Sequence, residues 1–295
     1  GRSAPEEPTG LALKSRLDAS LLSVLVLAAT PIGNLSDASP RLLAALADSD
    51  VIACEDTRNL SHLAKALGIT LKARLVSLHD HNERDAAAKI VELARDADVL
   101  LVSDAGMPTI SDPGYNLVRA CAEADIEVSV IPGPSAVIAA LAISGLATDR
   151  FTFEGFLPRK SGERKKLFQS LSREERTMIF FEAPHRILET LEDAASVLGD
   201  NRQAAVVREL TKKFEHAERG TLKDLVDWAK TEPRGEMVLV IAGAQAEEHD
   251  YEELAKKALQ LAAEGVGMKA AAAELARVTG ASKSVIYEHA LRLKA

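Results

Sequence analysis

Short apolar runs alternate with amphipathic stretches along the first half of the chain. Each run is too short for a helix and ends in turn-forming residues, which is typical of a strand buried in a parallel sheet. We expect such strands at residues 23–29, 51–53, 75–78, 99–102 and 127–131. The stretches between them predict helices at residues 40–47, 59–67, 83–95 and 113–124. Strands and helices that alternate in this way form βαβ units around a parallel sheet.

The regular alternation of strands and helices is interrupted around residues 147–150. We take this interruption as the boundary between two α/β domains, residues 21–147 and 148–245. The second domain has predicted strands at residues 151–156, 178–181, 203–207 and 237–242, and helices that end near residue 198 and span 222–229. Its alternation is less regular, which favours a mixed sheet. Residues 1–20 are rich in proline, glycine and acidic side chains, and we expect them to be disordered.

The last region, residues 246–295, is predicted to be a small helical domain. Helices are expected at residues 251–264, 268–278 and 282–293, with a break at Gly280. Two helices joined by a tight turn that contains glycine have the helix-turn-helix outline. A small appendage that packs on the rest of the chain is an equally good interpretation.

The composition is that of a globular protein. Hydrophobic residues make up 47% of the chain, and no apolar run approaches the length of a bilayer span. The first residues lack the basic and then apolar pattern of a signal peptide. The two cysteines, Cys54 and Cys121, fit neither a disulfide framework nor a zinc site. We therefore expect buried free thiols, a cytoplasmic location and no metal.

Several common catalytic motifs are absent from the sequence. It contains no phosphate-binding P-loop, no zinc-binding H-E-x-x-H and no G-x-S-x-G nucleophile elbow. Residues 265–270 match the dinucleotide-binding fingerprint by letter, but they follow a helical stretch instead of a strand. These observations exclude an ordinary nucleotide-hydrolysing or dehydrogenase site.

The sequence offers instead a set of loops at the carboxyl ends of predicted strands, at residues 30–37, 55–58, 103–112, 132–136 and 182–186. The first four should converge, because the carboxyl ends of parallel strands meet at one edge of the sheet. Their small and turn-forming residues offer backbone amides and carbonyls, which suit an adenine, ribose hydroxyls and a zwitterionic amino acid.

The loop at residues 103–112 is the strongest candidate for a ligand site. Ala105 and Gly106 allow close approach of a ligand. Asp104 and Asp112 would accept hydrogen bonds from an ammonium group or a ribose hydroxyl. Ser111 or Asp112 would equally serve as the cap of the next helix, with the following proline in its first turn.

Eight segments, in this order and spacing, make the chain resemble a known family. They are LAATPIGNLSDASPR, ACEDTR, SDAGMPTISDPG, VIPGPSA, FEGFLPRK, FFEAPHR, VVRELTKKFE and GEMVLVIAG, and they extend over residues 23–243. The family is that of ribosomal RNA methyltransferases of the tetrapyrrole-methylase-like (class III), S-adenosylmethionine-dependent type. The resemblance implies two α/β domains with the donor S-adenosyl-L-methionine in the cleft between them, a helical C-terminal domain and a homodimer. It also implies 2′-O-methylation of a cytidine in the decoding region of 16S ribosomal RNA of the small subunit.

The resemblance assigns site residues by motif. The donor would be lined by Pro31, Ser103, Asp104, Ala105, Gly106, Ile110, Ser111, Asp112, Pro132, Gly133, Ser135, Ala136, Phe181, Glu182 and Ala183. The loop at residues 30–37 and the cluster at residues 55–58 would face the acceptor. Met107 stands where a threonine is expected, and we expect little effect because the neighbouring contacts would be made by backbone.

The implied chemistry needs little from the protein. A sulfonium methyl group is electrophilic, so in-line placement of the ribose oxygen supplies much of the rate. The hydroxyl still needs a base or a group that stabilises its developing charge. The candidate bases are Asp37, Glu55, Asp56 and Glu182, and the candidate electrostatic partners are Arg58, Arg186 and Lys212. The sequence does not choose among them, and each has a structural alternative.

The net charge of −8 argues against a protein that coats nucleic acid by bulk charge. RNA phosphates would therefore need local basic surfaces. Three basic groups are candidates: Arg159, Lys160, Arg164, Lys165 and Lys166; Arg208, Lys212, Lys213 and Arg219; and Lys269, Arg277, Lys283, Arg292 and Lys294. An isolated charge run is more often a solvated face. Aromatic residues are only 4% of the chain, which favours an assembled ribosomal particle over a free single strand as the partner.

Two other functions stay open. One is another member of the same superfamily that acts on a tetrapyrrole or a protein side chain, against which the basic segments and the helical tail argue. The other is a non-enzymatic RNA-binding protein, which would not need a site for a methyl donor.

Overall fold

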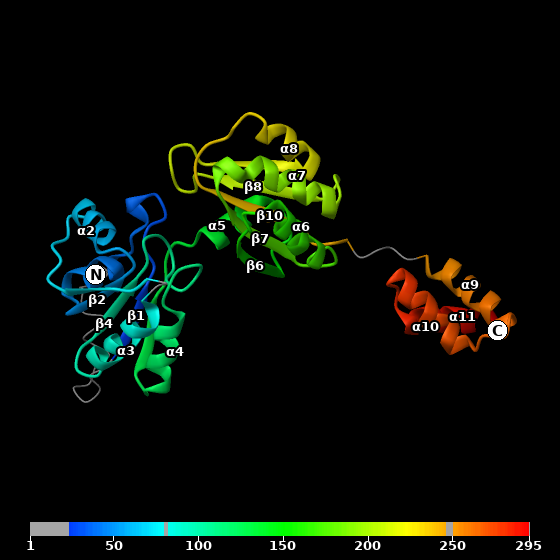
Figure 1. Ribbon diagram of the computed structural model, residues 1–295, viewed down its shortest axis with the longest axis horizontal. Helices are drawn as coiled ribbons and strands as arrows, with labels where there is room; N and C mark the ends of the chain where they lie inside the picture. The colour runs from blue at the N-terminus through cyan, green and yellow to red at the C-terminus, as the bar shows by residue number, and fades with distance from the viewer. Residues whose placement is uncertain (1–23, 80–81, 246–249, 295) are drawn as a thin grey trace, which may run out of the picture. The chain divides into compact units, whose positions relative to one another are not determined.

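The computed structural model describes residues 24–79, 82–245 and 250–294. The predicted lead-in, residues 1–20, lies outside the described residues. The chain divides into two compact units, one that ends at Gly243 and one that begins at Ala244. The first unit contains two five-stranded sheets and the second contains helices (Figure 1).

The first sheet is parallel, with the strand order β3-β2-β4-β1-β5. Its strands are β1 Val24–Ala28, β2 Val51–Cys54, β3 Arg74–Ser77, β4 Val99–Val102 and β5 Glu127–Ile131. The helices α1 (Pro40–Asp48) and α2 (Thr57–Ala66) pack on one face, and α3 (Glu83–Ala94) and α4 (Tyr115–Glu123) pack on the other. The predicted parallel sheet is confirmed, because strands buried on both faces read as continuous apolar runs.

The second sheet is mixed, with the order β6-β7-β10-β8-β9 and one parallel pair, β6 with β7. Its strands are β6 Phe151–Phe156, β7 Thr177–Glu182, β8 Gln203–Arg208, β9 His216–Thr221 and β10 Met237–Ile241. The helices α6 (Ser161–Ser170), α7 (Ile187–Leu198) and α8 (Leu222–Ala229) cover one face (Figure 1). The expected mixed sheet is confirmed.

The other face of the second sheet is only partly covered. The helix α5 (Ala136–Ser144) packs Val137 and Leu141 against this face, where Ile179 and Val240 meet them. Phe181, Val207 and Val238 also belong to this face, and they line a cavity. The uncovered part of the sheet is therefore available to a ligand.

The start of α4 corrects one prediction. Its N-cap is Gly114, with φ 129°, so neither Ser111 nor Asp112 caps the helix and Pro113 precedes it. The apolar pattern also does not predict α5, α6 or β9. The sequence of α5 is apolar all round, α6 is mostly polar, and the edge strand β9 has no alternation of apolar residues, so none shows the usual period.

The second unit consists of α9 (Tyr251–Ala263), α10 (Met268–Thr279) and α11 (Lys283–Lys294), which confirms the three predicted helices. Its core is built mainly from alanines, with Leu254 and Ile286, so the helices approach closely. Gly280 ends α10 in the left-handed conformation, with φ 75°, and α11 follows. Among the described helices, none is long and apolar enough to cross a membrane.

Candidate active site

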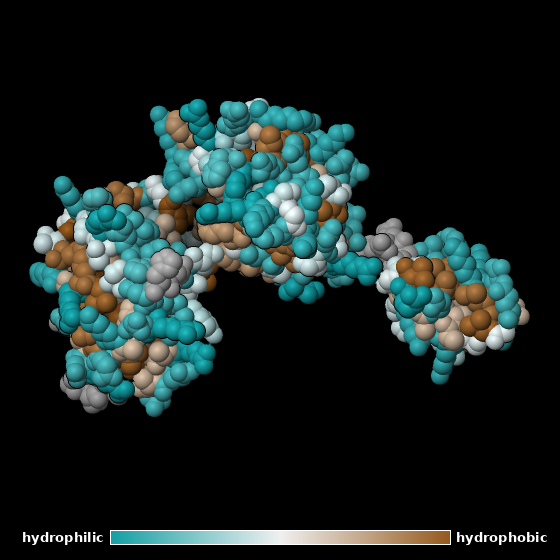
Figure 2. Space-filling model, viewed as in Figure 1, coloured by the Kyte–Doolittle hydropathy of each residue, from teal (hydrophilic) through white to brown (hydrophobic). Residues whose placement is uncertain are grey.

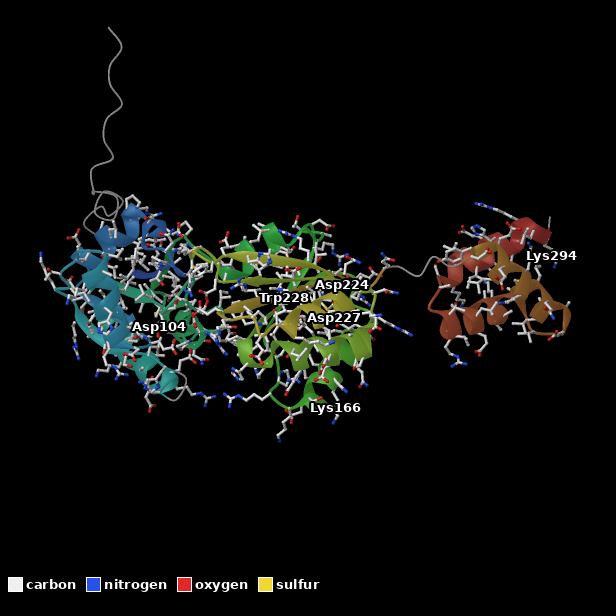
Figure 3. The ribbon with its side chains drawn as sticks, turned by 90° about the horizontal axis from the view of Figure 1, so that it is seen from above. Asp104, Lys166, Asp224, Asp227, Trp228 and Lys294 are labelled. Atoms are coloured by element: carbon white, nitrogen blue, oxygen red, sulfur yellow. The ribbon has the colours of Figure 1, made fainter. Side chains whose placement is uncertain are left out.

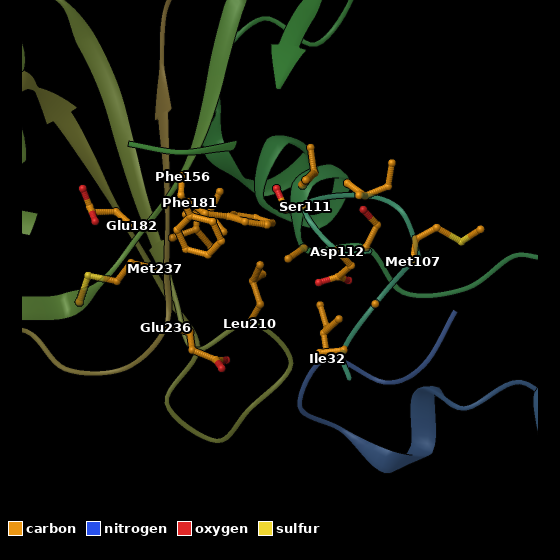
Figure 4. Close-up of a pocket in the computed structure, with 18 of the residues that line it drawn as sticks. Ile32, Met107, Ser111, Asp112, Phe156, Phe181, Glu182, Leu210, Glu236 and Met237 are labelled. Carbon is orange, nitrogen blue, oxygen red and sulfur yellow. The ribbon is translucent and has the colours of Figure 1, made fainter. Parts of the chain in front are cut away.

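A cavity of about 400 Å³ lies between the strand-end loops of the first sheet and the uncovered face of the second (Figure 4). Apolar surface is visible in Figure 2 where these two halves of the first unit meet. The cavity is lined by Ile32, Ala105, Gly106, Met107, Ile110, Ser111, Asp112, Ser135, Ala136, Val137, Phe156, Phe181, Glu182, Ala183, Pro184, Val207, Leu210, Glu236, Met237 and Val238. Apolar walls with a few polar groups, at this volume, are typical of a small-molecule site.

The loop at residues 103–114 forms the first wall and begins where β4 ends. Its start is tied to the end of β1, because Thr30 and Gly106 exchange backbone hydrogen bonds of 2.9 and 3.1 Å. Thr109 and Ser111 have left-handed backbone, with φ 74° and 60°. Such a conformation costs a non-glycine residue about 1–3 kcal/mol and persists only where the surroundings hold it, often at ligand sites.

The second wall is apolar and comes from the second sheet. The rings of Phe156 and Phe181 meet edge to face with centroids 5.3 Å apart, and the ring of Phe153 meets that of Phe181 in the same way, with centroids 5.0 Å apart. Phe156 is 62% exposed although it lines the cavity. Its ring is therefore available to the flat apolar part of a ligand.

Ten of the predicted donor residues line this cavity, namely Ala105, Gly106, Ile110, Ser111, Asp112, Ser135, Ala136, Phe181, Glu182 and Ala183. The other five, Pro31, Ser103, Asp104, Pro132 and Gly133, are not among its lining residues. Pro31 and Ser103 are buried behind the loops. A Cβ on Gly133 would lie 3.0 Å from the Cβ of Ala29, so the absence of a side chain lets the loop after β5 approach β1.

Asp104 instead contacts α2, next to the cluster at residues 55–58. Its carboxylate accepts a hydrogen bond of 2.7 Å from Nδ2 of Asn59, in the first turn of α2. The Asp104 side chain is exposed and belongs to the half of the unit that contains the first sheet (Figure 3). Its place favours the acceptor side of the site over the donor cavity.

Asp56 acts as the N-cap of α2, which gives it a structural function. It accepts from the backbone N–H of Arg58 at 2.8 Å and pairs with Nη2 of Arg58 at 2.9 Å. The hydrogen bond from the Arg58 side chain, then that from its backbone, lowers the pKa of Asp56 to about 2. A carboxylate of this acidity is a poor general base near neutral pH. The geometry therefore disfavours Asp56 as the base and leaves Arg58 as its partner.

Glu182 likewise has its partners inside the protein, next to the second sheet. Its side chain is fully buried and pairs with Arg186 at 2.5 Å. It also accepts from Oγ1 of Thr190 at 2.6 Å and from the backbone N–H of Ala183 at 2.7 Å. In Figure 4 its carboxylate points away from Ser111. These contacts use both charges inside the protein, which argues against the predicted roles of Glu182 as base and Arg186 as electrostatic partner.

Asp37 and Glu55 stay candidates for the base. Asp37 is exposed at the end of the short 3₁₀ helix η2 (Leu35–Asp37), in the loop after β1. Glu55 is half-buried directly after β2, and its backbone carbonyl accepts from Oγ of Ser77 at 3.1 Å. Both follow parallel strands, so both lie at the carboxyl edge of the first sheet.

Lys212 reaches the same region from the second domain. A Cβ on Gly33 would lie 2.7 Å from Cγ of Lys212, so the lysine packs directly on the loop after β1. Its Nζ pairs with Glu236 at 2.6 Å and with Glu209 at 3.3 Å. These carboxylates, Glu236 first, raise the pKa of Lys212. Because Glu236 lines the cavity, the Lys212 ammonium group lies close to the cavity, together with its two carboxylate partners.

The predicted basic segment at residues 159–166 begins directly before α6 and extends into its first half. Arg159, Lys160 and Lys166 are exposed, and Figure 3 shows Lys166 at the surface of the second domain. Arg164 is a correction: its side chain is 1% exposed and pairs with Asp193 of α7 at 2.7 Å. It holds two helices together and is not accessible to phosphate. Lys165 is half-exposed and pairs with the same aspartate at 3.4 Å.

The remaining basic candidates differ in their availability. Lys213, Lys269 and Lys283 are exposed. Arg219 instead donates to the carbonyls of Ser144 at 3.1 Å and Ile143 at 2.5 Å, at the end of α5. Cationic groups are favourable there because they meet the negative end of the helix dipole, so its charge has a structural function.

Several lining residues are missed by the sequence analysis, namely Ile32, Val137, Phe156, Pro184, Val207, Leu210, Glu236, Met237 and Val238. Five of them, Ile32, Val137, Val207, Leu210 and Val238, belong to the apolar cluster on the partly covered face of the second sheet, where an apolar residue reads as core. Within the described ranges, no group of three His, Cys, Asp or Glu side chains could hold a metal ion. Both cysteines are free and buried, as expected.

The comparisons with known proteins assign the chain to a family. A family model described as tetrapyrrole (corrin/porphyrin) methylases matches residues 24–226. The chain belongs to this family. A second model, described as the RsmI C-terminal HTH domain, matches residues 248–294 of this methylase and favours the helix-turn-helix interpretation of its tail.

The methylase has similar relatives among curated proteins. One from Haemophilus influenzae is 46% identical, over 92% of this chain and 97% of its own length. Others come from Mycobacterium tuberculosis strain CDC 1551 (48% identical, 85% and 88% covered) and Escherichia coli O157:H7 (44%, 90% and 94%). All three are named ribosomal RNA small subunit methyltransferase I.

Solved structures support the fold of this methylase. Diphthine synthase has a TM-score of 0.56 at 16% identity, over 75% of this chain and 89% of its own. Uroporphyrin-III C-methyltransferase from Thermus thermophilus, complexed with S-adenosyl homocysteine, has a TM-score of 0.52 at 17% identity, over 75% and 97%. At such identities the likeness concerns the fold alone.

Proposed function

We propose that this methylase transfers a methyl group from S-adenosyl-L-methionine to the ribose 2′-hydroxyl of a cytidine in the decoding region of 16S ribosomal RNA, on the small subunit. Relatives that are 44–48% identical over most of the chain carry the name ribosomal RNA small subunit methyltransferase I. The choice of cytidine and of the 2′-oxygen rests on the resemblance of the eight sequence segments.

The observation that carries the donor part of the proposal is the cavity between the two sheets. Its volume of about 400 Å³ suits a small ligand. The apolar wall that contains Phe156 and Phe181 suits the adenine, whereas Ser111, Asp112 and Ser135 offer polar atoms to the ribose and the amino-acid part. The cavity therefore fits a molecule with one flat apolar end and one zwitterionic end.

When bound, the donor supplies an electrophilic sulfonium methyl group. The protein then has to exclude water, place the ribose hydroxyl in line and accept its proton. Asp37 and Glu55 are candidate bases, and Asp104, oriented by Asn59 at 2.7 Å, joins them as an exposed carboxylate at the same sheet edge. Lys212, paired with Glu236 close to the cavity, would stabilise the developing negative charge.

The proposal is tested with labelled S-adenosyl-L-methionine and small ribosomal subunits from a strain that lacks this protein. The RNA is digested and its nucleosides are identified by mass spectrometry. We expect 2′-O-methylcytidine only when the enzyme is present. Donor binding without label in RNA would contradict the RNA substrate and would direct the search to tetrapyrrole or protein acceptors, whereas RNA binding without donor binding would identify a non-enzymatic RNA-binding protein.

The base is tested with the same assay in the variants Asp37→Asn, Glu55→Gln and Asp104→Asn. General-base catalysis contributes about 10²–10⁴-fold, so the correct variant should lose at least about 10²-fold in turnover and keep donor affinity. Asp227→Asn is the control, since Asp227 is an exposed carboxylate on α8 (Figure 3). If all three variants keep full turnover, positioning alone is the mechanism.

Contact with RNA is proposed for the exposed basic side chains Arg159, Lys160, Lys166, Lys213, Lys269 and Lys283. Lys166→Glu should weaken binding to the subunit and reduce its salt dependence, because phosphate contacts release counterions. Donor affinity should not change. An unaltered salt dependence would remove Lys166 from the RNA surface.

We also propose a homodimer located in the cytoplasm, where ribosomal subunits are found. Support for the dimer comes from β5, an edge strand on which Val128 and Val130 are 37% and 46% exposed on the same side. Val130→Asp should convert the dimer to a monomer in analytical ultracentrifugation. A wild-type protein that sediments as a monomer would contradict this proposal.

A further inference from the structure

The far end of the loop at residues 103–114 is held by a side chain from another element. Glu83, the first residue of α3, accepts hydrogen bonds from the backbone N–H of Gly114 at 2.9 Å and of Asn116 at 3.1 Å. Its second carboxylate oxygen accepts from Nδ2 of Asn116 at 2.6 Å. One carboxylate therefore receives three donors where the loop becomes α4.

The start of α4 has no side-chain cap of its own. Its N-cap is Gly114, and a Cβ there would lie 3.0 Å from Cδ2 of Leu101 and 3.2 Å from Cγ2 of Thr109. A capping side chain at this position would therefore be crowded by β4 and by the loop. Glu83, which belongs to α3, takes the part of the missing capping side chain. It accepts hydrogen bonds from backbone amides at the start of α4 and places a negative charge at the positive end of the helix dipole.

The charge of Glu83 is retained in the folded protein. Burial acts to raise the pKa of Glu83, but hydrogen bonds from Gly114 and Asn116 outweigh it and hold the pKa below its usual value. Glu83 also belongs to the first turn of α3, so its charge meets the positive ends of two helices.

The loop that Glu83 anchors is the same loop that lines the cavity. One end is fixed by the bridge between Thr30 and Gly106, and the other by Glu83. Between these points, the backbone N–H of Ile110 donates to the carbonyl of Met107 at a long 3.4 Å. The segment between the anchors also contains the two left-handed residues, which need external support.

We propose that Glu83 is a positioning residue for the methyl-donor site, which fixes the wall formed by Ser111 and Asp112 from the side remote from the donor. The inference rests on the proposed donor cavity. If the loop is loosened, the fraction of molecules with a binding-competent wall falls, and the apparent dissociation constant rises in inverse proportion.

The test is the variant Glu83→Gln, with the dissociation constant of S-adenosyl-L-methionine measured by calorimetry. Glutamine keeps one oxygen for the backbone amides, but it presents an amide group to Nδ2 of Asn116 and has no charge. We expect the dissociation constant to rise about tenfold, which corresponds to about 1.4 kcal/mol. The kcat at saturating donor should stay within about twofold, because the chemical groups are unchanged.

The matched control is Asp224→Asn, which removes the charge of a capping-box carboxylate on another helix, at a residue that does not line the cavity. Asp224 forms a capping box with Thr221 at the start of α8, in the second domain (Figure 3). The two variants should lower the melting temperature similarly, but only Glu83→Gln should weaken donor binding. A purely structural cap would give the same donor affinity in both variants.

Asn116→Ala provides a second measurement in case Glu83→Gln does not fold. It removes only the bond to Nδ2, so we expect a smaller rise in the dissociation constant, about threefold. If the folded variants bind the donor as tightly as the wild type, the positioning role of Glu83 is refuted. If the wild-type protein does not bind the donor, the proposed function is wrong, and the inference about Glu83 is wrong with it.

Discussion

Removal of the Asp193 carboxylate should strongly destabilise the half of the first unit that contains the second sheet. Asp193 of α7 accepts from Nε of Arg164 at 2.8 Å, pairs with its Nη2 at 2.7 Å and accepts from Oγ of Ser161 at 2.9 Å. The Arg164 side chain is 1% exposed, so Asp193→Ala leaves a buried guanidinium with too little compensation. Loss of one partner from a buried pair costs about 3–5 kcal/mol.

The lower end of this range is expected, because Glu189 lies 3.7 Å from Nη2 of Arg164 and supplies part of the missing charge. A loss of about 3 kcal/mol is a large share of a typical total stability of about 5–15 kcal/mol. With a urea dependence of about 2 kcal/mol per molar, the unfolding midpoint should fall by about 1.5 M. Trp228, the single tryptophan, packs on the core that α6 and α7 share, so its fluorescence reports this unfolding (Figure 3).

Two further variants distinguish the contribution of the buried Arg164–Asp193 pair to stability from that of the neighbouring Glu189. Glu189→Gln should change stability by less than about 0.5 kcal/mol, because its side chain is 71% exposed. The double variant Arg164→Met with Asp193→Leu should recover most of the loss, since apolar side chains of similar volume replace buried ion pairs well. A cost of Asp193→Ala below about 1 kcal/mol, or no recovery in the double variant, would refute the assignment of Arg164 to the interior.

Other predictions concern the edge of the first sheet. Gly33→Ala should lower the free energy of unfolding by about 1–3 kcal/mol through overpacking, because the alanine Cβ would lie 2.7 Å from Cγ of Lys212. If the variant unfolds in urea with wild-type stability, the lysine side chain moves aside and the prediction is wrong. The contact with Arg58 lowers the pKa of Asp56 in the folded protein from an ordinary 3.8 to about 2. This contact therefore stabilises the fold above pH 3.8, and the stabilisation is lost as the pH falls toward 2. An NMR titration of the Asp56 carboxyl group with its midpoint at 3.8 would contradict this. Burial, followed by the charges of Asp104 and Asp56, raises the pKa of Cys54 to about 12. A thiol reagent at about pH 8 should therefore modify this cysteine only after denaturation. Labelling of Cys54 in the native protein would contradict its burial.

The sequence alone determined the elements of the first sheet, because strands buried on both faces and helices with local start signals are encoded by neighbouring residues. Ser39, directly before the helix predicted at residues 40–47, accepts the capping hydrogen bond from the backbone N–H of Leu42 at 3.0 Å. The loops at strand ends were located in the same way, and the parallel sheet brought them to one edge. Seven of the fifteen residues assigned to the donor by motif line the cavity for this reason, and three more, Phe181, Glu182 and Ala183, reach it from the second sheet.

The tertiary structure decided what each charged side chain does, because that depends on partners far along the chain. Arg164 reads as part of a basic surface, yet Asp193, twenty-nine positions later, holds it in the interior. Asp104 reads as a donor ligand, but its carboxylate accepts a hydrogen bond from Asn59 of α2 and is not among the residues that line the cavity. The cap of α4 is likewise not local: crowding at Gly114 leaves no room for a side chain, so Glu83 supplies the carboxylate from another helix. Local sequence encodes backbone conformation, whereas electrostatic partners are set only when distant elements pack together.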